Sequence, residues 1–350
     1  MQPVIFLGPT LPRAEAESIL AADYRPPAAL ADVWRAARDH PPAIGIIDGY
    51  FHSVPSVWHK EILWALREGI AVFGAASMGA LRAAELSAFG MVGVGRIYEA
   101  YAAGEFEDDD EVALAHADAA HGFRPASEPL VNIRATLARA VEESVLSSAL
   151  RGRLEAIAKA LYYPERIWPE MSRRAREEGG DADALRLLEE WLPAHRVDQK
   201  RADAVALLEA IRGPIAAQPP AFHFEETVLW RTLLDREEAA DHRAVLEELK
   251  LKPPLFDKVT RDAGASTAAV LAALRRQGAY LSLLENARRK SVLALEATGR
   301  DLPEREALIR WFFEERLGGW PDDLPAFLRA RGWVSDEILA EVAAREYRAS

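Results

Sequence analysis

The chain has 350 residues, which is long for one domain and sufficient for two domains of ordinary size. Half of the residues are apolar and 28% are charged, a balance that excludes a mainly disordered chain. Acidic residues outnumber basic residues by 55 to 43, and the net charge of −12 argues against a general nucleic-acid-binding surface or a protein that binds anionic membranes.

The sequence contains no cysteine, which excludes disulfides, thiolate nucleophiles, persulfide carriers and cysteine-based metal sites. No segment approaches the ~20 consecutive apolar residues that cross a bilayer, and the first residues lack the features of a secretion signal. We therefore expect a protein of the cytoplasm.

The first part of the chain alternates between short apolar runs and helical patterns. Strands are predicted at residues 4–7, 44–47 and 70–73, with a weaker candidate at 22–25. Helices are predicted at residues 11–20, 28–39, 55–68 and 78–88. Apolar strands that alternate with helices predict an α/β fold, with a small, doubly wound, mostly parallel sheet of the Rossmann-like kind.

The rest of the chain shows only helical patterns, which are interrupted by prolines. The clearest helices are predicted at residues 130–150, 202–211, 267–281 and 304–317. We therefore expect an α/β core domain at residues 1–127, followed by an all-helical region at 128–350 with one or two subdomains.

Polar side chains follow the predicted strands where ligands bind in open parallel sheets, at the carboxyl edge. Thr10, Asp48, His52 and Ser77 are expected to meet there. Ser77 lies between a strand and a helix and has the small neighbours Ala75 and Gly79, which approximates a nucleophile elbow. The alternative is that Ser77 only caps its helix.

Two histidines are candidates for a general base beside Ser77. His59 is expected in the first turn of a helix near the same edge, where Asp48 could orient it, and His52 is the competing candidate. A histidine at the border of an apolar face can also serve only as a hydrogen-bonding group. Arg82 and Glu85 are three residues apart, so that they can pair on one helix face, or Arg82 can hold an anionic group.

Two other segments carry weaker signals. Six acidic residues occur within residues 105–111, and a solvated helix start is favoured there over a Mg²⁺ or Ca²⁺ site, so that no metal ligand is predicted. The glycines of residues 90–95 predict a flexible turn after a helix. Because the sequence has neither a dinucleotide-binding nor a P-loop motif, no cofactor is predicted.

Several segments, in this order, resemble the core of the TfuA-like family. They are DGYF at 48–51, VWHKEIL at 57–63, GAASMGALRAAEL at 74–86, GM at 90–91, GVG at 93–95, DDEV at 109–112 and NIR at 132–134. The resemblance covers about residues 3–140.

The resemblance implies a function in peptide biosynthesis. TfuA-like proteins are companions of YcaO-type enzymes, which use ATP to activate backbone amides of ribosomally made peptides for thioamide formation. The resemblance further implies that a sulfur-carrier protein with a C-terminal thiocarboxylate is the source of sulfide, and that this protein helps to release or deliver the sulfur. Because this chain has no thiol, the sulfur cannot pass through a persulfide on it.

The leading hypothesis is therefore a thiocarboxylate hydrolase in which Ser77 attacks the carrier's thiocarboxylate and His59 assists water in clearing the acyl-enzyme. Arg82 or Arg134 would neutralise the substrate's charge. The remaining candidates for substrate binding are Thr10, Met78, Gly79, Glu85 and Asn132. The alternatives are a noncatalytic adapter that binds the YcaO enzyme and its peptide or sulfur donor, and a nucleotide-binding protein.

Overall fold

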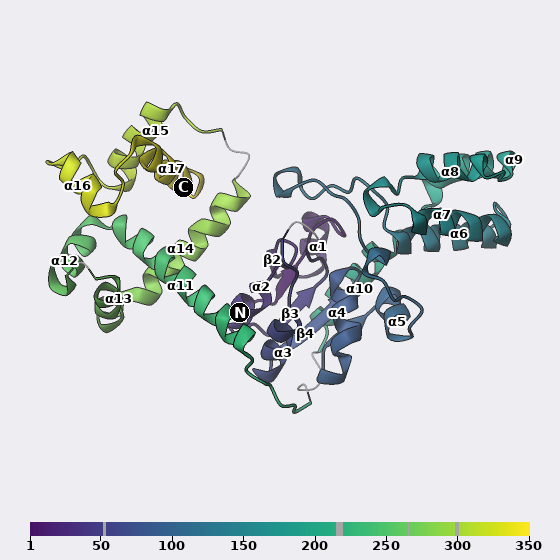
Figure 1. Ribbon diagram of the computed structural model, residues 1–350, viewed down its shortest axis with the longest axis horizontal. Coiled ribbons are helices and arrows are strands. Elements are labelled where there is room, and N and C mark those ends of the chain that lie inside the picture. The colour runs from purple at the N-terminus through teal and green to yellow at the C-terminus, as the bar shows by residue number, and fades with distance from the viewer. Residues whose placement is uncertain (52–53, 215–219, 265, 298–300) are drawn as a thin grey trace. The chain divides into compact units, whose positions relative to one another are not determined.

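The computed structural model describes residues 1–51, 54–214, 220–264, 266–297 and 301–350 (Figure 1). Contacts divide the chain into two compact units, Met1–Glu226 and Thr227–Ser350. The first unit therefore extends well beyond residue 127, where the sequence analysis places the end of the core domain. The reason is that a later helix, α10 (Gln199–Arg212), packs against the sheet.

Five parallel strands form one sheet in the order β2-β1-β3-β4-β5. The strands are β1 (Val4–Phe6), β2 (Asp23–Arg25), β3 (Ala43–Ile46), β4 (Ala71–Ala75) and β5 (Val92–Val94). Ile5 in β1 lies opposite Tyr24 on one side and Gly45 on the other. This arrangement confirms the predicted doubly wound sheet, and its order reverses at β1 and β3, where a ligand crevice is expected.

Strand β5 was not predicted, because its glycines indicate a turn. Gly90 has a φ of 98° and ends the preceding helical turn, but Gly93 pairs with Gly74 of β4. A Cβ atom on Gly93 would lie 2.1 Å from the ring of Tyr98. The glycine therefore lets an aromatic ring cover the edge of the sheet.

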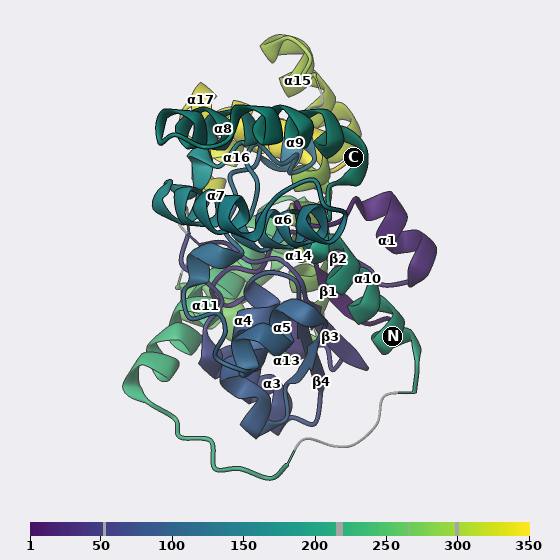
Figure 2. The ribbon, with the colours of Figure 1, turned by 90° about the vertical axis from the view of Figure 1, so that its right-hand side faces the viewer.

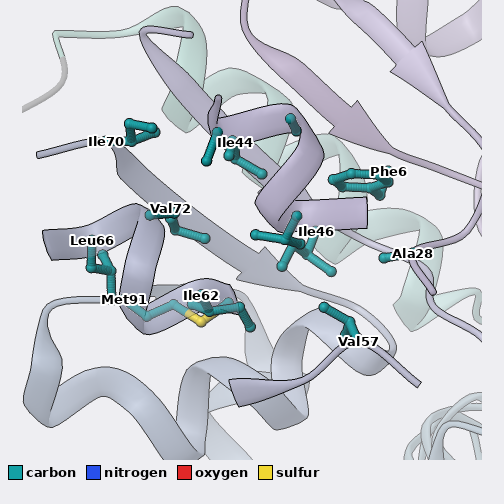
Figure 3. Close-up of a cluster of buried hydrophobic side chains, with 14 of the residues drawn as sticks. Phe6, Ala28, Ile44, Ile46, Val57, Ile62, Leu66, Ile70, Val72 and Met91 are labelled. Atoms are coloured by element: carbon teal, nitrogen blue, oxygen red, sulfur yellow. The ribbon is translucent and has the colours of Figure 1, made fainter. Parts of the chain in front are cut away.

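Helices cover both faces of the sheet. One face packs against α2 (Asp32–Ala37), α3 (His59–Arg67) and α4 (Met78–Leu86), and the other against α1 (Arg13–Ile19) and α10. The first interface buries Phe6, Ile44, Ile46, Ile62 and Val72, among others (Figure 3). Helix α5 (Arg96–Ala102) packs against α4 and α10.

A bundle of four helices lies between α5 and α10 in the sequence. Its members are α6 (Leu130–Glu142), α7 (Ser148–Ala160), α8 (Trp168–Glu177) and α9 (Ala182–His195), and they share a core of their own (Figure 2). The single helix predicted at residues 130–150 is two helices, because Ser147 accepts a hydrogen bond from the N–H of Leu150 and caps α7. Short helical turns are η1 (Ser87–Phe89), η2 (Asp109–Glu111), η3 (Ala119–His121) and η4 (Tyr163–Glu165).

The second unit is helical, which confirms the prediction for the end of the chain. It contains α11 (Val228–Lys250), α12 (Pro253–Ala263), α13 (Thr267–Arg276), α14 (Ala279–Glu296), α15 (Arg305–Trp311), the π-helical turn η5 (Phe312–Arg316), α16 (Leu324–Arg331) and α17 (Asp336–Arg348). Lys290 joins α14 to α11 and α17 through Glu248 and Glu346, at 2.6 and 2.9 Å. Among the residues described in either unit, no helix has the length and apolar character needed to cross a membrane.

Candidate active site

A cavity of about 250 Å³ opens at the carboxyl edge of the sheet. The loops after β1, β2, β3 and β4 all reach it, together with residues 112–116 and the start of α10. Its polar lining consists of Asp48, Tyr50, Ser77, His116, Tyr163 and Lys200. The structure thus brings Ser77 and Asp48 to one edge, at the place where the strand order reverses.

Ser77 follows a strained turn at the end of β4. The N–H of Ser77 donates a hydrogen bond to the carbonyl oxygen of Ala75 at 2.7 Å, and Ala76 between them has a φ of 64°. A three-residue turn with positive φ at a non-glycine residue is rare and costs of order 1–3 kcal/mol. The turn directs the chain from the sheet into α4, which begins at Met78.

The Ser77 hydroxyl does not cap α4, because its side chain makes no capping hydrogen bond. Its oxygen lies instead 3.0 Å from Nζ of Lys200. Ser77 is only 3% exposed, so this contact is shielded from bulk water. The interpretation of Ser77 as a simple helix cap is therefore not supported, and its hydroxyl faces an amine.

Glycines allow α4 to approach the sheet closely. A Cβ atom on Gly79 would lie 1.7 Å from the carbonyl oxygen of Ile46, and one on Gly74 would lie 2.1 Å from that of Gly79. The N–H of Gly79 points to the carbonyl oxygen of Ile47 at 3.4 Å. Gly79 and the buried side chain of Met78 thus position the turn that carries Ser77.

Lys200 enters the cavity from the first turn of α10. Its Nζ lies 3.0 Å from the carbonyl oxygen of Val112 and 3.9 Å from Oδ1 of Asp48, in addition to the contact with Ser77. Lys200 is 2% exposed. Burial lowers the pKa of its ammonium group, although the negative charges of Asp48 and Asp198 oppose this shift. The neutral amine, which can accept a proton from a hydroxyl, is therefore favoured relative to a lysine in water.

Asn132 fixes the start of α10. Its side-chain oxygen accepts a hydrogen bond from the N–H of Lys200 at 3.1 Å, and its amide nitrogen donates to Oδ1 of Asp198 at 3.0 Å. Asp198 also caps α10 by accepting from the N–H of Arg201. Asn132, a predicted substrate-binding residue, thus orients the helix that carries the amine, and it also lines a second cavity together with Thr10 and Lys200.

Asp48 is held by the loop after β1. Its carboxylate accepts hydrogen bonds from the N–H groups of Gly8 and Thr10, at 2.9 and 3.1 Å, and from the hydroxyl of Thr10 at 2.6 Å. The predicted meeting of Thr10 and Asp48 is thus observed. Because these three donors orient Asp48, its negative charge stays near Lys200 at little entropic cost.

His59, Arg82 and Glu85 form a separate group. Oε2 of Glu85 lies 2.7 Å from both Nε2 of His59 and Nη1 of Arg82, and Arg82 Nε also donates to the carbonyl oxygen of Val57. Burial alone would raise the pKa of Glu85, but the hydrogen bonds from His59 and Arg82 leave it below its usual value. Within the part of the chain that the structure describes, the expected contact between His59 and Ser77 is not formed.

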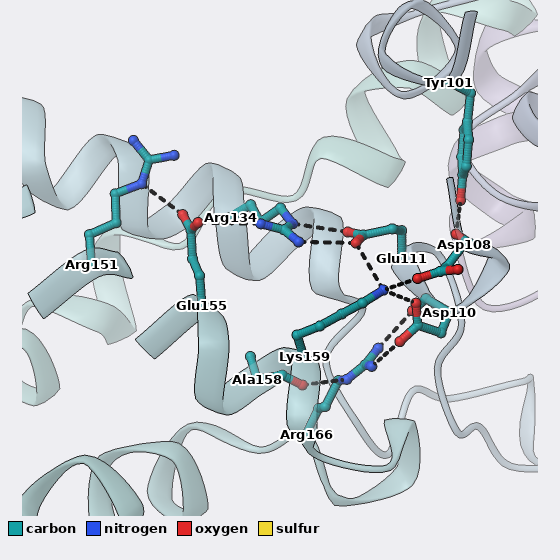
Figure 4. Close-up of polar contacts among 10 residues, drawn as sticks. All are labelled: Tyr101, Asp108, Asp110, Glu111, Arg134, Arg151, Glu155, Ala158, Lys159 and Arg166. Atoms are coloured by element: carbon teal, nitrogen blue, oxygen red, sulfur yellow. Dashed lines mark hydrogen bonds and ion pairs between the residues drawn. The ribbon is translucent and has the colours of Figure 1, made fainter. Parts of the chain in front are cut away.

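Two further predictions concern His52, the other candidate base, and the acidic run at residues 105–111. His52 lies outside the described residues. Three residues of the acidic run, Asp108, Asp110 and Glu111, join a network of ion pairs, while the others are exposed. Arg134 donates two hydrogen bonds to Glu111, at 2.9 and 3.0 Å (Figure 4). Lys159 and Arg166 bind Asp110 in the same network. Arg134 is therefore engaged in this network.

The described residues contain no group of three or more carboxylate or imidazole side chains that could hold a metal ion. The sequence analysis missed four polar residues of the cavity, Tyr50, His116, Tyr163 and Lys200. A signal for Lys200 exists, because Lys200 precedes Ala204, Leu207 and Ile211 on the buried face of one amphipathic helix. A lysine at such a position is unusual and indicates a buried partner.

The fold and the site define a doubly wound α/β protein with a buried serine–lysine pair at the switch point of its sheet. Residues 48–167 match the family model described as TfuA-like protein, which confirms the resemblance found in the sequence. The matched region covers about a third of the chain and includes Asp48, Ser77 and His116 but not Lys200. No curated protein matches the chain.

Proposed function

We propose that this chain is an accessory protein of YcaO-dependent peptide backbone thioamidation that hydrolyses the C-terminal thiocarboxylate of a sulfur-carrier protein and releases sulfide. The family match supports the association with YcaO-type enzymes. The observation that carries the hydrolytic activity is the 3.0 Å approach of Ser77 Oγ and Lys200 Nζ inside a cavity. Serine–lysine pairs serve as nucleophile and base in several unrelated hydrolases.

In the proposed first step, neutral Lys200 accepts the proton of the Ser77 hydroxyl. The serine oxygen then attacks the carbon of the thiocarboxylate, and the C–S bond breaks to give an acyl-enzyme. The N–H of Met78, directly after Ser77 at the start of α4, is the proposed donor to the oxyanion. Water then hydrolyses the ester and regenerates Ser77.

The contacts of Lys200 suit the role of the base. Its burial lowers its pKa, and Val112 fixes the amine by accepting a hydrogen bond at 3.0 Å. Asp48, at 3.9 Å, stabilises the ammonium formed after proton transfer. We therefore assign to Lys200 the function that the sequence suggested for His59, whose Nε2 is paired with Glu85.

The absence of cysteine constrains how sulfur moves. Since the chain has no thiol, the proposed product is free sulfide, formed beside the partner that consumes it. The partners proposed are a YcaO-type enzyme in the cytoplasm, the thiocarboxylated carrier and, indirectly, a ribosomally made precursor peptide. These partners need no thiol on this protein.

The test uses several sulfur-carrier proteins with a C-terminal thiocarboxylate, in the absence of any YcaO enzyme. Intact mass measures the conversion of thiocarboxylate to carboxylate, and a sulfide assay measures the product. The parent chain and His59→Gln should both release sulfide, whereas Ser77→Ala and Lys200→Met should not. The His59 variant is the matched control because its contact with Glu85 lies outside the cavity.

Two results would overturn the proposal. Equal turnover by the parent chain and Ser77→Ala would place the nucleophile elsewhere. If the parent released no sulfide from any carrier, the noncatalytic adapter would be favoured, and binding of the chain to the YcaO enzyme and to unmodified carrier would then be measured by calorimetry.

A further inference from the structure

The proposed hydrolysis requires a proton at sulfur. A thiocarboxylate is an anion, so attack by Ser77 gives an adduct from which sulfur would leave as the doubly charged sulfide ion. If the sulfur is protonated first, it leaves as hydrosulfide, which is a much better leaving group. A proton donor near the sulfur atom therefore accelerates the step, typically by 10²- to 10⁴-fold for general acid catalysis.

Most ionisable groups of the cavity are unsuited to this role. Lys200 is engaged with Ser77 as the base, and Asp48 accepts three hydrogen bonds from the loop after β1. Burial raises the pKa of the Tyr50 phenol, with a further contribution from the charge of Asp32. Burial and the neighbouring Tyr162 likewise raise the pKa of Tyr163. Both phenols are consequently weak proton donors near neutral pH.

His116 is the remaining ionisable side chain in the lining of the cavity. Its Nδ1 lies 2.7 Å from the carbonyl oxygen of Ala117, which can only accept, so Nδ1 carries a hydrogen. In the described part of the chain, Nε2 has no hydrogen-bond partner, and it is the nitrogen left to exchange a proton with a substrate. The rings of Tyr50 and Phe123 hold the imidazole, with centroids at 6.4 and 5.7 Å.

We propose that His116 is the proton donor to the departing sulfur. This inference rests on the proposed function. As Ser77 Oγ bonds to the carbon and Lys200 takes the serine proton, protonated His116 gives its Nε2 proton to sulfur. The C–S bond then breaks, and hydrosulfide leaves with the bonding electrons. At this stage His116 is neutral and Lys200 is an ammonium ion.

The same two groups then serve the second step with their functions exchanged. Neutral His116 accepts a proton from water as the oxygen attacks the ester, and the Lys200 ammonium returns a proton to Ser77 Oγ as the C–O bond breaks. The carboxylic acid product loses its proton to solvent. Thiocarboxylate and water have become carboxylate, hydrosulfide and one proton, and both side chains have returned to their starting states.

The test compares two leaving groups on the same carrier tail. One substrate is the thiocarboxylate, and the other is an aryl thioester, whose thiolate leaves without a proton. With enzyme in excess over substrate, release of sulfide or aryl thiol reports the first step alone. His116→Gln should slow sulfide release by 10²- to 10⁴-fold and leave thiol release near the parent rate. In His116→Gln treated with the aryl thioester, acyl-enzyme on Ser77 should accumulate and be detected by intact mass, because hydrolysis of the ester also needs His116.

His121→Gln is the matched control, because this exposed histidine lies in the same loop and contacts Asp118. Retained thiol release shows that a variant is folded. The inference fails if His116→Gln releases sulfide at the parent rate, or if it slows both leaving groups equally. If the parent chain cleaves neither substrate, the proposed function itself fails, so the two failures are distinguishable.

Discussion

Replacement of Lys200 by methionine separates the chemical function of the amine from its contribution to stability. Methionine has a similar length and is apolar, so it fills the buried site without a charge. The substitution leaves the carbonyl oxygen of Val112 without its hydrogen bond from Nζ, at a cost of about 1–3 kcal/mol. It also removes the cost of burying an amine whose pKa is lowered by desolvation. The two effects oppose each other.

We therefore expect the free energy of unfolding of Lys200→Met to lie within about 2 kcal/mol of the parent value. Asp48 remains satisfied, since Gly8 and Thr10 donate three hydrogen bonds to it. The rate of sulfide release should nevertheless fall by about 10²- to 10⁴-fold, because no group would remain at 3.0 Å to accept the serine proton. Urea unfolding and single-turnover sulfide release measure the two quantities independently.

The pH dependence of the reaction rate tests whether Lys200 acts as the base in its neutral form. Since burial lowers the pKa of Lys200, the rate at which the parent chain releases thiol from the aryl thioester, a leaving group that needs no proton from His116, should rise with pH and level off below the ordinary lysine pKa of about 10.4. Lys200→Arg keeps a cation but has no accessible neutral form, so it should be inactive across this range. A parental rate in either variant would refute the assignment of Lys200 as the base.

Three further predictions concern stability. Burial raises the pKa of Glu61 to about 7, although backbone hydrogen bonds from Ala31, Trp58 and Trp34 oppose this shift. The free energy of unfolding of the parent chain should therefore fall by on the order of 3 kcal/mol as the pH rises from 4.5 to 7, because the buried carboxyl group becomes charged. Urea unfolding of Glu61→Gln at several pH values should not show this decrease. Gly79→Ala should destabilise the fold by more than about 3 kcal/mol, because the added Cβ atom would overlap the carbonyl oxygen of Ile46. Gly152→Ala is the matched control on α7, where the added Cβ atom meets open space, and it should stabilise the fold by about 0.5–1 kcal/mol. Thermal unfolding measures both changes. Arg166→Met should cost about 1–3 kcal/mol in urea unfolding, because the carbonyl oxygens of Ala158 and Asp110 lose their hydrogen bonds while Lys159 still pairs with the Asp110 carboxylate, and an unchanged midpoint would contradict this.

The sequence predicted the fold better than the site. Apolar runs such as residues 44–47 can be recognised because both faces of a parallel strand are buried. Strand β5 escaped recognition because Gly93 has no side chain to indicate burial. Its pairing with β4 depends on a neighbouring strand that local sequence does not specify.

The edge of the sheet that holds Ser77 and Asp48 followed from topology alone. The partner of Ser77 did not, because the nearest histidine in the sequence, His59, lies on a helix that directs it to Glu85. Lys200 is 123 positions away and reaches the cavity only because α10 packs on the sheet. Pattern analysis gives the buried face of such a helix, but it does not give the surface that the helix covers.

The position of Lys200 on α10 links the proposed activity to the folding of the first unit. The serine belongs to the fourth strand–helix turn, and its proposed base belongs to a helix that follows the whole α6–α9 bundle in the chain. During synthesis, a nascent chain holds an unactivated hydroxyl until α10 has left the ribosome and docked. Under the proposed function, molecules in which α10 is not yet made or is locally undocked are therefore expected to release no sulfide from the carrier.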